Sequence, residues 1–249
     1  MLLEVSNLTV CYGTAMLLND VSMAVGDGQL VSLIGPNGAG KSTLLRATTG
    51  LVKWEKQTSR STRASDITIQ GEVRLAGERI DTLPAHEIAK RGLAHCPERA
   101  RVFSEMTVTD NLRAGGYLCK SRAEMKKSLE TVYELFPVLK QRGNQVSGTL
   151  SGGERQMLAI ARALMVQPRL LCIDEPSTGL SSNVKQELFG TIEAIRDAGM
   201  GVLLVEQDVE AAFRLASWNY LLSHGKAIAE GTKDDLLQDE TIRKTYLGL

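Results

Sequence analysis

The sequence lacks an excess of charge of either sign. Its 29 basic residues are balanced by 29 acidic ones, so no global field draws the chain toward nucleic acid or anionic lipid. This balance disfavours nucleic-acid binding as the main function. At 249 residues the chain is long enough to bury a substantial core, as one large domain or two small ones.

The sequence also lacks paired cysteines and long apolar runs. Its four cysteines form no C-x-x-C pair, which disfavours a disulfide framework or a zinc site and predicts reduced thiols that pack as small apolar side chains. No run approaches the roughly 18 apolar residues of a membrane span. Glu4 and Asn7 interrupt the stretch that a signal peptide would need unbroken. We therefore expect a chain that is soluble by itself and acts at a membrane only through a partner.

What is present is an alternation of strand and helix patterns. Continuous apolar runs, typical of strands buried on both faces of a parallel sheet, occupy residues 30–34, 170–173, 201–205 and 219–222. Helical patterns follow three of these runs, at residues 41–50, 181–198 and 208–217. This order predicts an α/β fold. Residues 2–12 and 67–80 alternate apolar with polar, which predicts a small antiparallel layer.

The middle of the chain has a different character. Between Thr107 and Leu139 apolar residues recur at helical spacing, which predicts an inserted helical subdomain. Ser121 and Glu124 predict a capping box at the start of its main helix. Residues 53–66 are polar, rich in Ser and Thr, and without periodicity. They predict a mobile surface loop, with a specific docking element as the alternative.

Residues 35–42, GPNGAGKS, have the spacing of a P-loop and lie between an apolar run and a helical pattern. Glycines let successive N–H groups point inward, and the helix dipole adds about half a positive charge at the same place. Lys41 is expected to reach the β- and γ-phosphates of a nucleotide, and the Ser42 hydroxyl to ligate magnesium. A glycine-rich turn that merely starts a helix would leave both side chains unexplained.

The run LLCIDEPSTGL at residues 170–180 ends an apolar strand with two carboxylates. Asp174 would lie at the carboxyl edge of the sheet, where α/β folds bind ligands and a P-loop enzyme holds its magnesium. Glu175 follows, well placed to orient or deprotonate a water. Taken alone, such a pair is more often a solvated turn; beside a P-loop the catalytic interpretation is favoured.

A second anion cradle is predicted at LSGGERQM, residues 150–157. Ser151 is a good N-cap, Gly152 and Gly153 let backbone approach a ligand closely, and Glu154 completes a capping box. The cradle contains no lysine.

GPNGAGKST, LSGGERQ and LCIDEP, in this order and at these separations, resemble the ATP-binding cassette (ABC) ATPases over essentially the whole chain. The resemblance implies a P-loop NTPase (RecA-like) core with an antiparallel β layer at residues 1–95 and 158–249. It also implies a helical subdomain at residues 96–157 that carries LSGG, with ATP and Mg²⁺ as cofactors. Because cassettes of this family pair head to tail, Ser151, Gly152 and Gly153 would hold the γ-phosphate of ATP on the partner's P-loop.

Further site residues come from the same resemblance. The phosphate contacts would be Gly35, Asn37, Gly38, Ala39, Gly40, Lys41, Ser42 and Thr43. Tyr12, in VCYG, matches the family's adenine-stacking aromatic, although a tyrosine that ends a strand is otherwise commonly a packing residue.

Three positions depart from the family pattern. Glu98 replaces a usual glutamine, Gln207 a usual histidine, and Ser181 a usual aspartate. Glu98 can still offer an oxygen to magnesium, and the Gln207 amide can still donate to a γ-phosphate, but Gln207 cannot become cationic. Glu175, Gln207 and Lys41 are thus the expected catalytic residues, and Ser42, Asp174 and Glu98 the expected metal ligands.

PERARVF, VEQD and the closing YLGL resemble one branch of the family, the shorter ATPase subunit of bacterial branched-chain amino acid importers, with urea and amide importers close by. This implies a peripheral location on the cytoplasmic face of the cell membrane and an indirect link to a periplasmic substrate-binding protein. It also implies transmembrane permease subunits as partners, in contact near Glu98 through Asn111, and a second ATPase subunit, identical or a sister.

The alternatives are a cassette for another cargo, such as urea, amides or lipid, and two proteins without transport. A soluble cassette acting on DNA or ribosomes usually has a long coiled coil or a second cassette, and neither is in this sequence. A nucleotide-regulated scaffold without turnover is disfavoured because Glu175 is retained.

Overall fold

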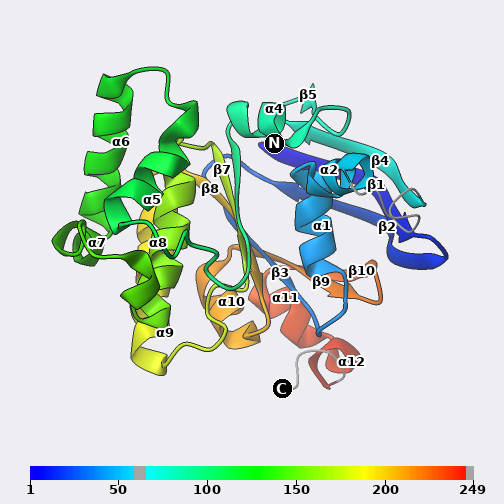
Figure 1. The fold of residues 1–249 in the computed structure, drawn as a ribbon. Coiled ribbons are helices and arrows are strands. Elements are labelled where there is room, and N and C mark those ends of the chain that lie inside the picture. The colour runs from blue at the N-terminus through cyan, green and yellow to red at the C-terminus, as the bar shows by residue number, and fades with distance from the viewer. Residues whose placement is uncertain (59–65, 245–249) are drawn as a thin grey trace.

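The computed structural model describes residues 1–58 and 66–244, which form two sheets with helices around them (Figure 1). The strands are β1 (Leu3–Tyr12), β2 (Ala15–Val25), β3 (Leu30–Ile34), β4 (Ile67–Leu75), β5 (Glu78–Arg79), β6 (Leu93–Cys96), β7 (Leu170–Asp174), β8 (Gly201–Glu206), β9 (Trp218–Ser223) and β10 (Lys226–Gly231). The helices are α1 (Lys41–Thr48), α2 (Leu51–Thr58), α4 (Ala85–Lys90), α5 (Val108–Gly115), α6 (Arg122–Leu135), α7 (Pro137–Gln141), α8 (Gly152–Leu164), α9 (Ser182–Asp197), α10 (Val209–Leu215), α11 (Lys233–Gln238) and α12 (Glu240–Ile242). Two short 3₁₀ helices are η1 (Gly116–Leu118) and η2 (Ser147–Thr149).

The six-stranded sheet has the order β10-β9-β3-β8-β7-β6. Strands β9, β3, β8, β7 and β6 are mutually parallel, and only β10 is antiparallel to its neighbour. Every residue of β3, β7 and β8 is buried, as continuous apolar runs predict for strands covered on both faces. The predicted α/β, P-loop NTPase fold is confirmed. Strand β6 was not predicted, because its four residues include a histidine and are too few to show a pattern.

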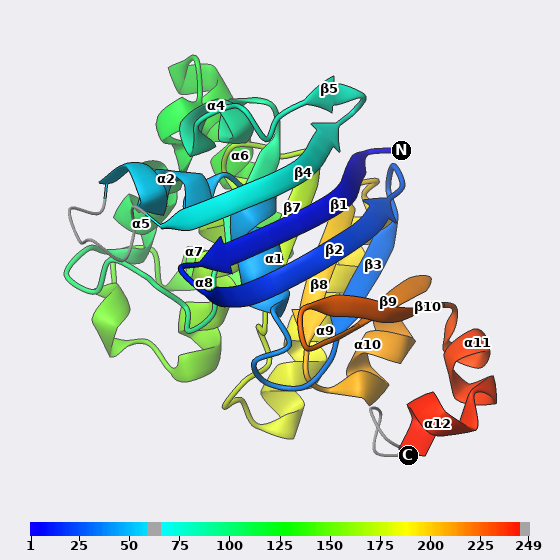
Figure 2. The ribbon, with the colours of Figure 1, turned by 90° about the vertical axis from the view of Figure 1, so that its right-hand side faces the viewer.

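The antiparallel sheet has the order β2-β1-β4-β5, and Figure 2 shows it as a separate layer beside α1. Its inner face shares one apolar core with α1 and the larger sheet, including Leu3, Leu44 and Val31. The predicted strands at residues 2–12 and 67–80 are confirmed. Strand β2 was missed because bulges break its alternation: Asp20 has a left-handed φ of 57°, and the register with β1 shifts on either side of it.

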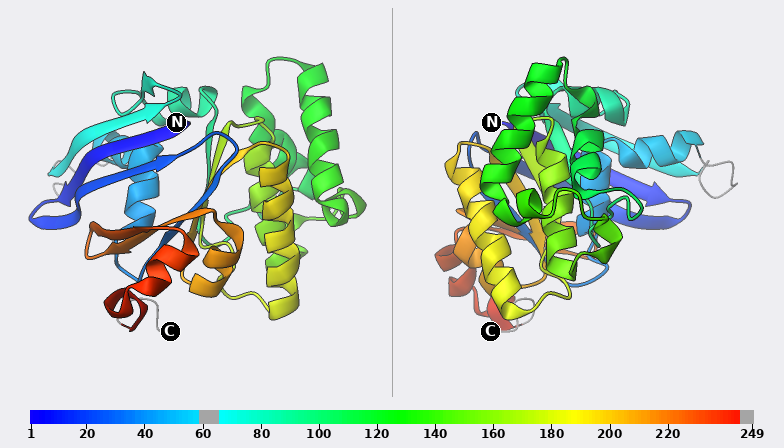
Figure 3. Two further views of the ribbon diagram at one scale, coloured as in Figure 1. Left: turned by 180° about the vertical axis from the view of Figure 1, so that it is seen from behind. Right: turned by 60° about the vertical axis from the view of Figure 1, so that its left-hand side comes forward.

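Helices α5 to α8 gather on the side of the large sheet away from the antiparallel layer (Figures 1 and 3). The predicted capping box at α6 is only half formed. The Ser121 hydroxyl accepts from the Glu124 N–H at 3.1 Å, but the Glu124 carboxylate accepts from the N–H of Lys120, one residue too early to close the box. The expected subdomain boundary after residue 157 falls inside α8. This helix contacts α5 in the predicted subdomain and β7 in the predicted core. The division into core and subdomain therefore stays a prediction.

The loop prediction for residues 53–66 was wrong over its first part. Helix α2 runs to Thr58, and the Thr58 hydroxyl donates to the carbonyl of Trp54 at 2.8 Å. Only Val52 is buried in this helix, so it has too narrow an apolar face to be recognised from periodicity. Residues 59–65 lie outside the described residues.

A buried polar link joins the segment after Glu98 to the turn before LSGG. Asn111 and Ser147 are fully buried and hydrogen-bonded to each other at 3.1 Å. The Asn111 side chain also accepts from the N–H of Phe103 at 2.8 Å and donates to its carbonyl at 3.1 Å. The link fixes α5 and the Phe103 segment against η2, which leads directly into α8.

Among the described helices, none combines the length and the apolarity that a membrane crossing requires. All four cysteines are free. Cys96 and Cys172 lie in the core as predicted, and burial raises the pKa of each thiol to about 12.

Candidate functional site

The predicted site residues converge because four neighbouring parallel strands end at one edge of the large sheet. In sheet order, β3 leads into the glycine-rich loop, β8 into Gln207, β7 into Glu175, and β6 into Glu98. The carboxyl edge of a parallel sheet is where α/β folds place ligands. Segments up to about 170 residues apart in the chain are brought together by strand order.

The loop from Gly35 to Lys41 has a shape that only glycine allows at two points. Gly35 and Gly40 have φ values of 150° and 103°. A Cβ at Gly35 would lie 2.1 Å from the carbonyl oxygen of Leu222, and one at Gly40 would lie 2.7 Å from that of Leu17. Helix α1 begins at Lys41 without a side-chain cap, so its first turn offers N–H groups to an anion.

Lys41 is almost completely buried, with 4% of its side chain exposed. Its Nζ donates to the carbonyls of Gly35 at 2.7 Å and Pro36 at 3.1 Å, and lies 3.5 Å from Glu175 Oε1. The ammonium is therefore held over the loop, where a polyphosphate would need a positive charge.

Glu175 is buried and sits in a strained conformation with a left-handed φ of 44°. Its N–H donates to the Val205 carbonyl at 2.9 Å, which continues the β7–β8 pairing by one residue and aims the carboxylate across the end of β8. The amide Nε2 of Gln207 donates to Glu175 Oε2. Gln207 thus contacts the carboxylate, and the expectation that its amide contacts a γ-phosphate stays a prediction.

Asp174 carries the most perturbed carboxyl group of the site. Burial, reinforced by the negative charges of Glu175 and Glu98, raises the pKa of Asp174 to about 6, although the Ser42 hydroxyl and Lys41 act in the opposite direction. Its Oδ1 is buried and has no hydrogen-bond partner among the described residues. Such an oxygen is costly unless a cation or donor reaches it. Together with the Ser42 hydroxyl it fits a magnesium ion, which takes one or two carboxylates and completes its shell with phosphates and water.

Glu98 faces the same region but is half exposed and ion-paired to its neighbour Arg99 at 3.0 Å. It lines a cavity of about 590 Å³ together with Gln207, Glu175, Thr178, Leu17, Arg99 and residues 37–43 of the loop. The cavity therefore brings together the loop residues Asn37 to Thr43 with Glu98, Glu175 and Gln207. Asp174 instead lines the second cavity described below, and Gly35 lines neither. Tyr12 and the three LSGG residues do not line the first cavity.

Tyr12 lies at the end of β1, half buried, and its hydroxyl donates to Glu55 Oε2 on α2 at 2.9 Å. The aromatic ring also packs against the core shared by the two sheets. A contact of this ring with adenine stays a prediction.

The LSGG segment forms the predicted capping box. The Ser151 hydroxyl accepts from the Glu154 N–H at 3.3 Å, and the Glu154 carboxylate accepts from the Ser151 N–H at 2.8 Å and pairs with Arg142 at 2.7 Å. Ser151 and Gly152 are exposed. Gly153 is buried, and a Cβ there would lie 2.3 Å from Cγ1 of Val184 on α9. Gly153 thus has a packing role that the sequence did not reveal.

Glu206 is a site residue that sequence reasoning missed. It ends β8, is 1% exposed, and accepts hydrogen bonds from the Ser177 N–H at 3.1 Å, the Ser177 hydroxyl at 3.0 Å and the Gln207 N–H at 3.3 Å. Burial raises its pKa. Glu206 fixes the loop after Glu175 to the strand that carries Gln207. The available signal was a carboxylate ending an apolar run, as at Asp174.

We expect Glu206→Leu to lower the free energy of unfolding by about 2–3 kcal/mol, because it leaves the buried N–H of Ser177 without an acceptor. Glu206→Gln retains one acceptor oxygen and should cost about half as much. Urea denaturation of both variants tests this. Equal stability of Glu206→Leu and the unmodified chain would show that the loop finds other partners.

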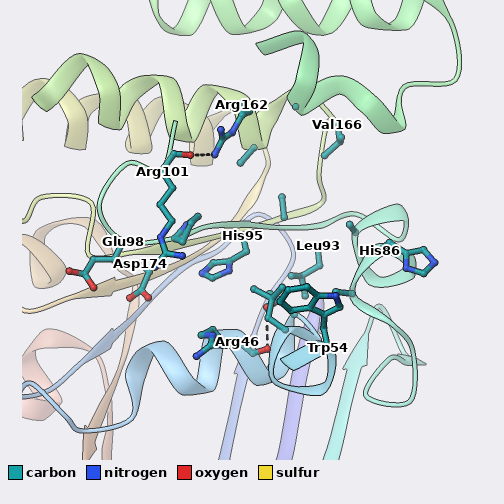
Figure 4. A pocket seen from close by; sticks show the side chains of 18 of the residues that line it. Arg46, Trp54, His86, Leu93, His95, Glu98, Arg101, Arg162, Val166 and Asp174 are labelled. Carbon is teal, nitrogen blue, oxygen red and sulfur yellow. Dashed lines mark hydrogen bonds between the residues drawn. The ribbon is translucent and has the colours of Figure 1, made fainter. Parts of the chain in front are cut away.

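A second and larger cavity, of about 830 Å³, has both Glu98 and Asp174 in its lining (Figure 4). Its apolar lining includes Leu93, Leu118, Val166 and the half-exposed Trp54 of α2. Its polar lining includes Arg46, His95, Arg101 and Arg162. Burial, with the charges of Arg46 and Arg101, lowers the pKa of His95 to about 4, so this ring is neutral near pH 7. Ser42 and Glu98 line both cavities.

Comparisons of the sequence and of the fold with known proteins all lead to the same family. The family model described as ABC transporter matches residues 18–178. The high-affinity branched-chain amino acid transport ATP-binding protein BraG of Pseudomonas aeruginosa is 41% identical, over 99% of this chain and 100% of its own. The lipopolysaccharide export system ATP-binding protein LptB of Haemophilus influenzae is 32% identical, over 99% of this chain and 97% of its own. A solved ATP binding subunit of an ABC transporter is 29% identical with a TM-score of 0.79, covering 100% of this chain and 97% of that one.

Proposed function

This chain belongs to the ABC transporter family and is an ATPase subunit that couples ATP hydrolysis to transport, and we propose that it drives an importer of branched-chain or closely related amino acids. The observation that carries the cargo assignment is the 41% identity to BraG over the full length of both chains. The 32% identity to LptB favours a lipid exporter as the second candidate.

Hydrolysis is assigned to three side chains. Lys41, buried and held over the glycine-rich loop, binds the β- and γ-phosphates. Glu175 orients and deprotonates the attacking water. Its position beside Lys41, with a hydrogen bond from the Gln207 amide to its carboxylate, supports this role. Gln207 holds that carboxylate in place and donates to the γ-phosphate. Because its amide does not titrate, its contribution does not change with pH.

Magnesium is assigned to Ser42 and Asp174, with Glu98 as a further oxygen donor. The buried, unpartnered Oδ1 of Asp174 supports this assignment. A magnesium ion held by these residues would supply positive charge to the phosphates. A cation at this point would also lower the pKa of Asp174 from its raised value and keep the carboxylate ionised.

The working unit is a pair of cassettes around two ATP molecules. The exposed Ser151 and Gly152, at a capped helix N-terminus outside the chain's own cavity, support a role at a partner's ATP. The cradle needs no lysine because the anion would arrive already paired with the other chain's Lys41. The partner is a second copy or a sister subunit.

The permease subunits are assigned to the larger cavity. It combines an apolar lining with Arg101 and Arg162, and Glu98 and Arg101 of the segment that the sequence indicated as the contact region line it. A helix end from a permease subunit would fit a hollow of this size. Such a contact would hold the chain at the cytoplasmic face of the cell membrane, with the periplasmic binding protein acting only through the permease.

The cargo is tested by uptake. A strain without this gene should lose at least about nine-tenths of its high-affinity uptake of labelled leucine, isoleucine or valine, because transport without its ATPase subunit lacks a driving reaction. Reintroducing the gene should restore uptake, and the Glu175→Gln form should not. Labelled lysine uptake is the control and should be unchanged. Normal uptake of all three amino acids together with impaired lipopolysaccharide export would replace the proposal by the second candidate.

A further inference from the structure

Helix α2, which the sequence did not reveal, brings a carboxylate to the point where three elements meet. Figure 2 shows α2 beside the ends of β1 and β4 and next to α1. Glu55 on α2 accepts a hydrogen bond from the hydroxyl of Tyr12 at the end of β1, at 2.9 Å. The same oxygen, Oε2, accepts from Nη2 of Arg46 on α1 at 2.6 Å. One carboxylate therefore ties the end of β1 to the helix that starts at Lys41.

This arrangement fixes a ring relative to the phosphate-binding helix. Arg46 lies on α1 five residues after Lys41, so any displacement of Tyr12 away from α1 must stretch one of the two bonds to Glu55. A ring that contacts the base must lie at a set distance from the loop that holds the phosphates, because the nucleotide is of fixed length. Without a partner for its hydroxyl, a tyrosine at a strand end could change its side-chain rotamer, and the distance between its ring and the loop would then vary.

The direction of the Tyr12 bond is clear from its chemistry. Burial, followed by the hydrogen bond and negative charge of Glu55, raises the pKa of the Tyr12 hydroxyl, so it remains protonated and donates. The acceptor is a carboxylate already paired with a guanidinium, and such charge-assisted bonds are stronger than neutral ones. Arg46 and Glu55 are 41% and 33% exposed, which screens the pair and limits its energy.

We propose that Glu55 is a positioning residue for nucleotide binding, which acts by holding the Tyr12 ring at the distance from α1 that the base of ATP requires. The inference rests on the proposed function and on the sequence-based prediction that the Tyr12 ring contacts the base of ATP. It adds a residue of α2 that lies outside every motif of the sequence.

The test compares two probes that share the phosphates and differ in the base. We expect Glu55→Ala to weaken binding of Mg-ATP by about 5-fold, a discounted value for one partly exposed hydrogen bond to a charged group. Binding of inorganic triphosphate, which has no base, should stay unchanged. Glu55→Gln keeps an acceptor for Tyr12 and should bind ATP nearly as the unmodified chain does. Equal weakening of both probes by Glu55→Ala would show a merely structural role and overturn the proposal.

A double-mutant cycle isolates the path through Tyr12. Tyr12→Phe keeps the ring and removes the hydroxyl, so it should reproduce the Glu55→Ala effect, and the double variant should be no worse than either single one. Additive losses would mean that Glu55 acts by another route. Glu87→Ala is the matched control, since Glu87 of α4 is similarly exposed and is paired with Lys90 and Arg91. It should leave both affinities unchanged.

Tyr12→Ala separates this inference from the proposed function. It should weaken ATP binding more than Tyr12→Phe does, because the ring itself is lost. If it leaves ATP affinity unchanged, Tyr12 does not contact the base and the role of Glu55 is refuted. The ATPase and importer assignments would stand in that case, because they are measured by turnover and uptake.

Discussion

Replacing Glu175 by glutamine is expected to reduce ATP turnover by at least about 100-fold, the usual loss when a general base is removed. Glutamine keeps the size of the side chain and can accept from the Gln207 amide, but it cannot take a proton from water. Lys41 keeps its two carbonyl partners at Gly35 and Pro36, so nucleotide binding should be retained. Steady-state release of phosphate by the purified chain measures the effect.

The same substitution should trap the paired state. If hydrolysis is the step that separates two cassettes, the Glu175→Gln chain should sediment as a dimer in Mg-ATP and as a monomer in Mg-ADP. Glu130→Gln is the control, because Glu130 is an exposed carboxylate of α6 whose partner Lys126 lies 3.8 Å away. It should leave turnover and sedimentation unchanged. Equal turnover by the Glu175→Gln and unmodified chains would remove Glu175 from its assigned role.

Introducing arginine at Ser151 should abolish ATP-dependent pairing of two chains. ATP binding by the single chain should stay within about 2-fold of normal, which is a change of less than about 0.4 kcal/mol in the free energy of binding. Ser151 is exposed at the N-terminus of α8 and does not line its own chain's cavity. A long side chain there would occupy the space that a partner's γ-phosphate needs. The measurement is sedimentation in Mg-ATP with Glu175→Gln as background, together with a titration of ATP on the monomer.

Loss of the helix cap must be separated from the steric effect. Ser151→Ala removes the hydroxyl that accepts from Glu154 and should cost about 1 kcal/mol of stability, but it adds no bulk. It should weaken pairing only in part. Loss of ATP binding in the Ser151→Arg monomer would contradict a site shared between two chains, because it would place Ser151 at its own chain's nucleotide.

The parts of the fold that sequence predicted are those with a strong local signal. Strands β3, β7 and β8 are continuous apolar runs, and the glycine-rich loop has a spacing that few other structures require. Convergence of Lys41, Asp174 and Glu175 follows from strand order once a parallel sheet is accepted. The position of these three side chains relative to one another could therefore be predicted from motifs.

The features that could not be predicted depend on contacts between distant segments. Helix α2 buries one residue, so nothing in its sequence distinguishes it from a loop. Gly153 matches an anion cradle in sequence, and only the packing of α8 on α9 reveals that Val184 excludes a side chain there. The hydrogen bond between Gln207 and Glu175 depends on the left-handed turn after β7, which no pattern of residue types indicates.

The presence of Ser42 and Glu98 in the lining of both cavities has a thermodynamic consequence. A ligand that shifts these two side chains in one cavity alters the affinity of the other cavity, and equilibrium linkage makes the two effects equal in size. If ATP strengthens the hold on a permease helix tenfold, that helix must strengthen the hold on ATP tenfold as well. Nucleotide affinity measured on the isolated chain would then differ from that of the assembled transporter by this same factor.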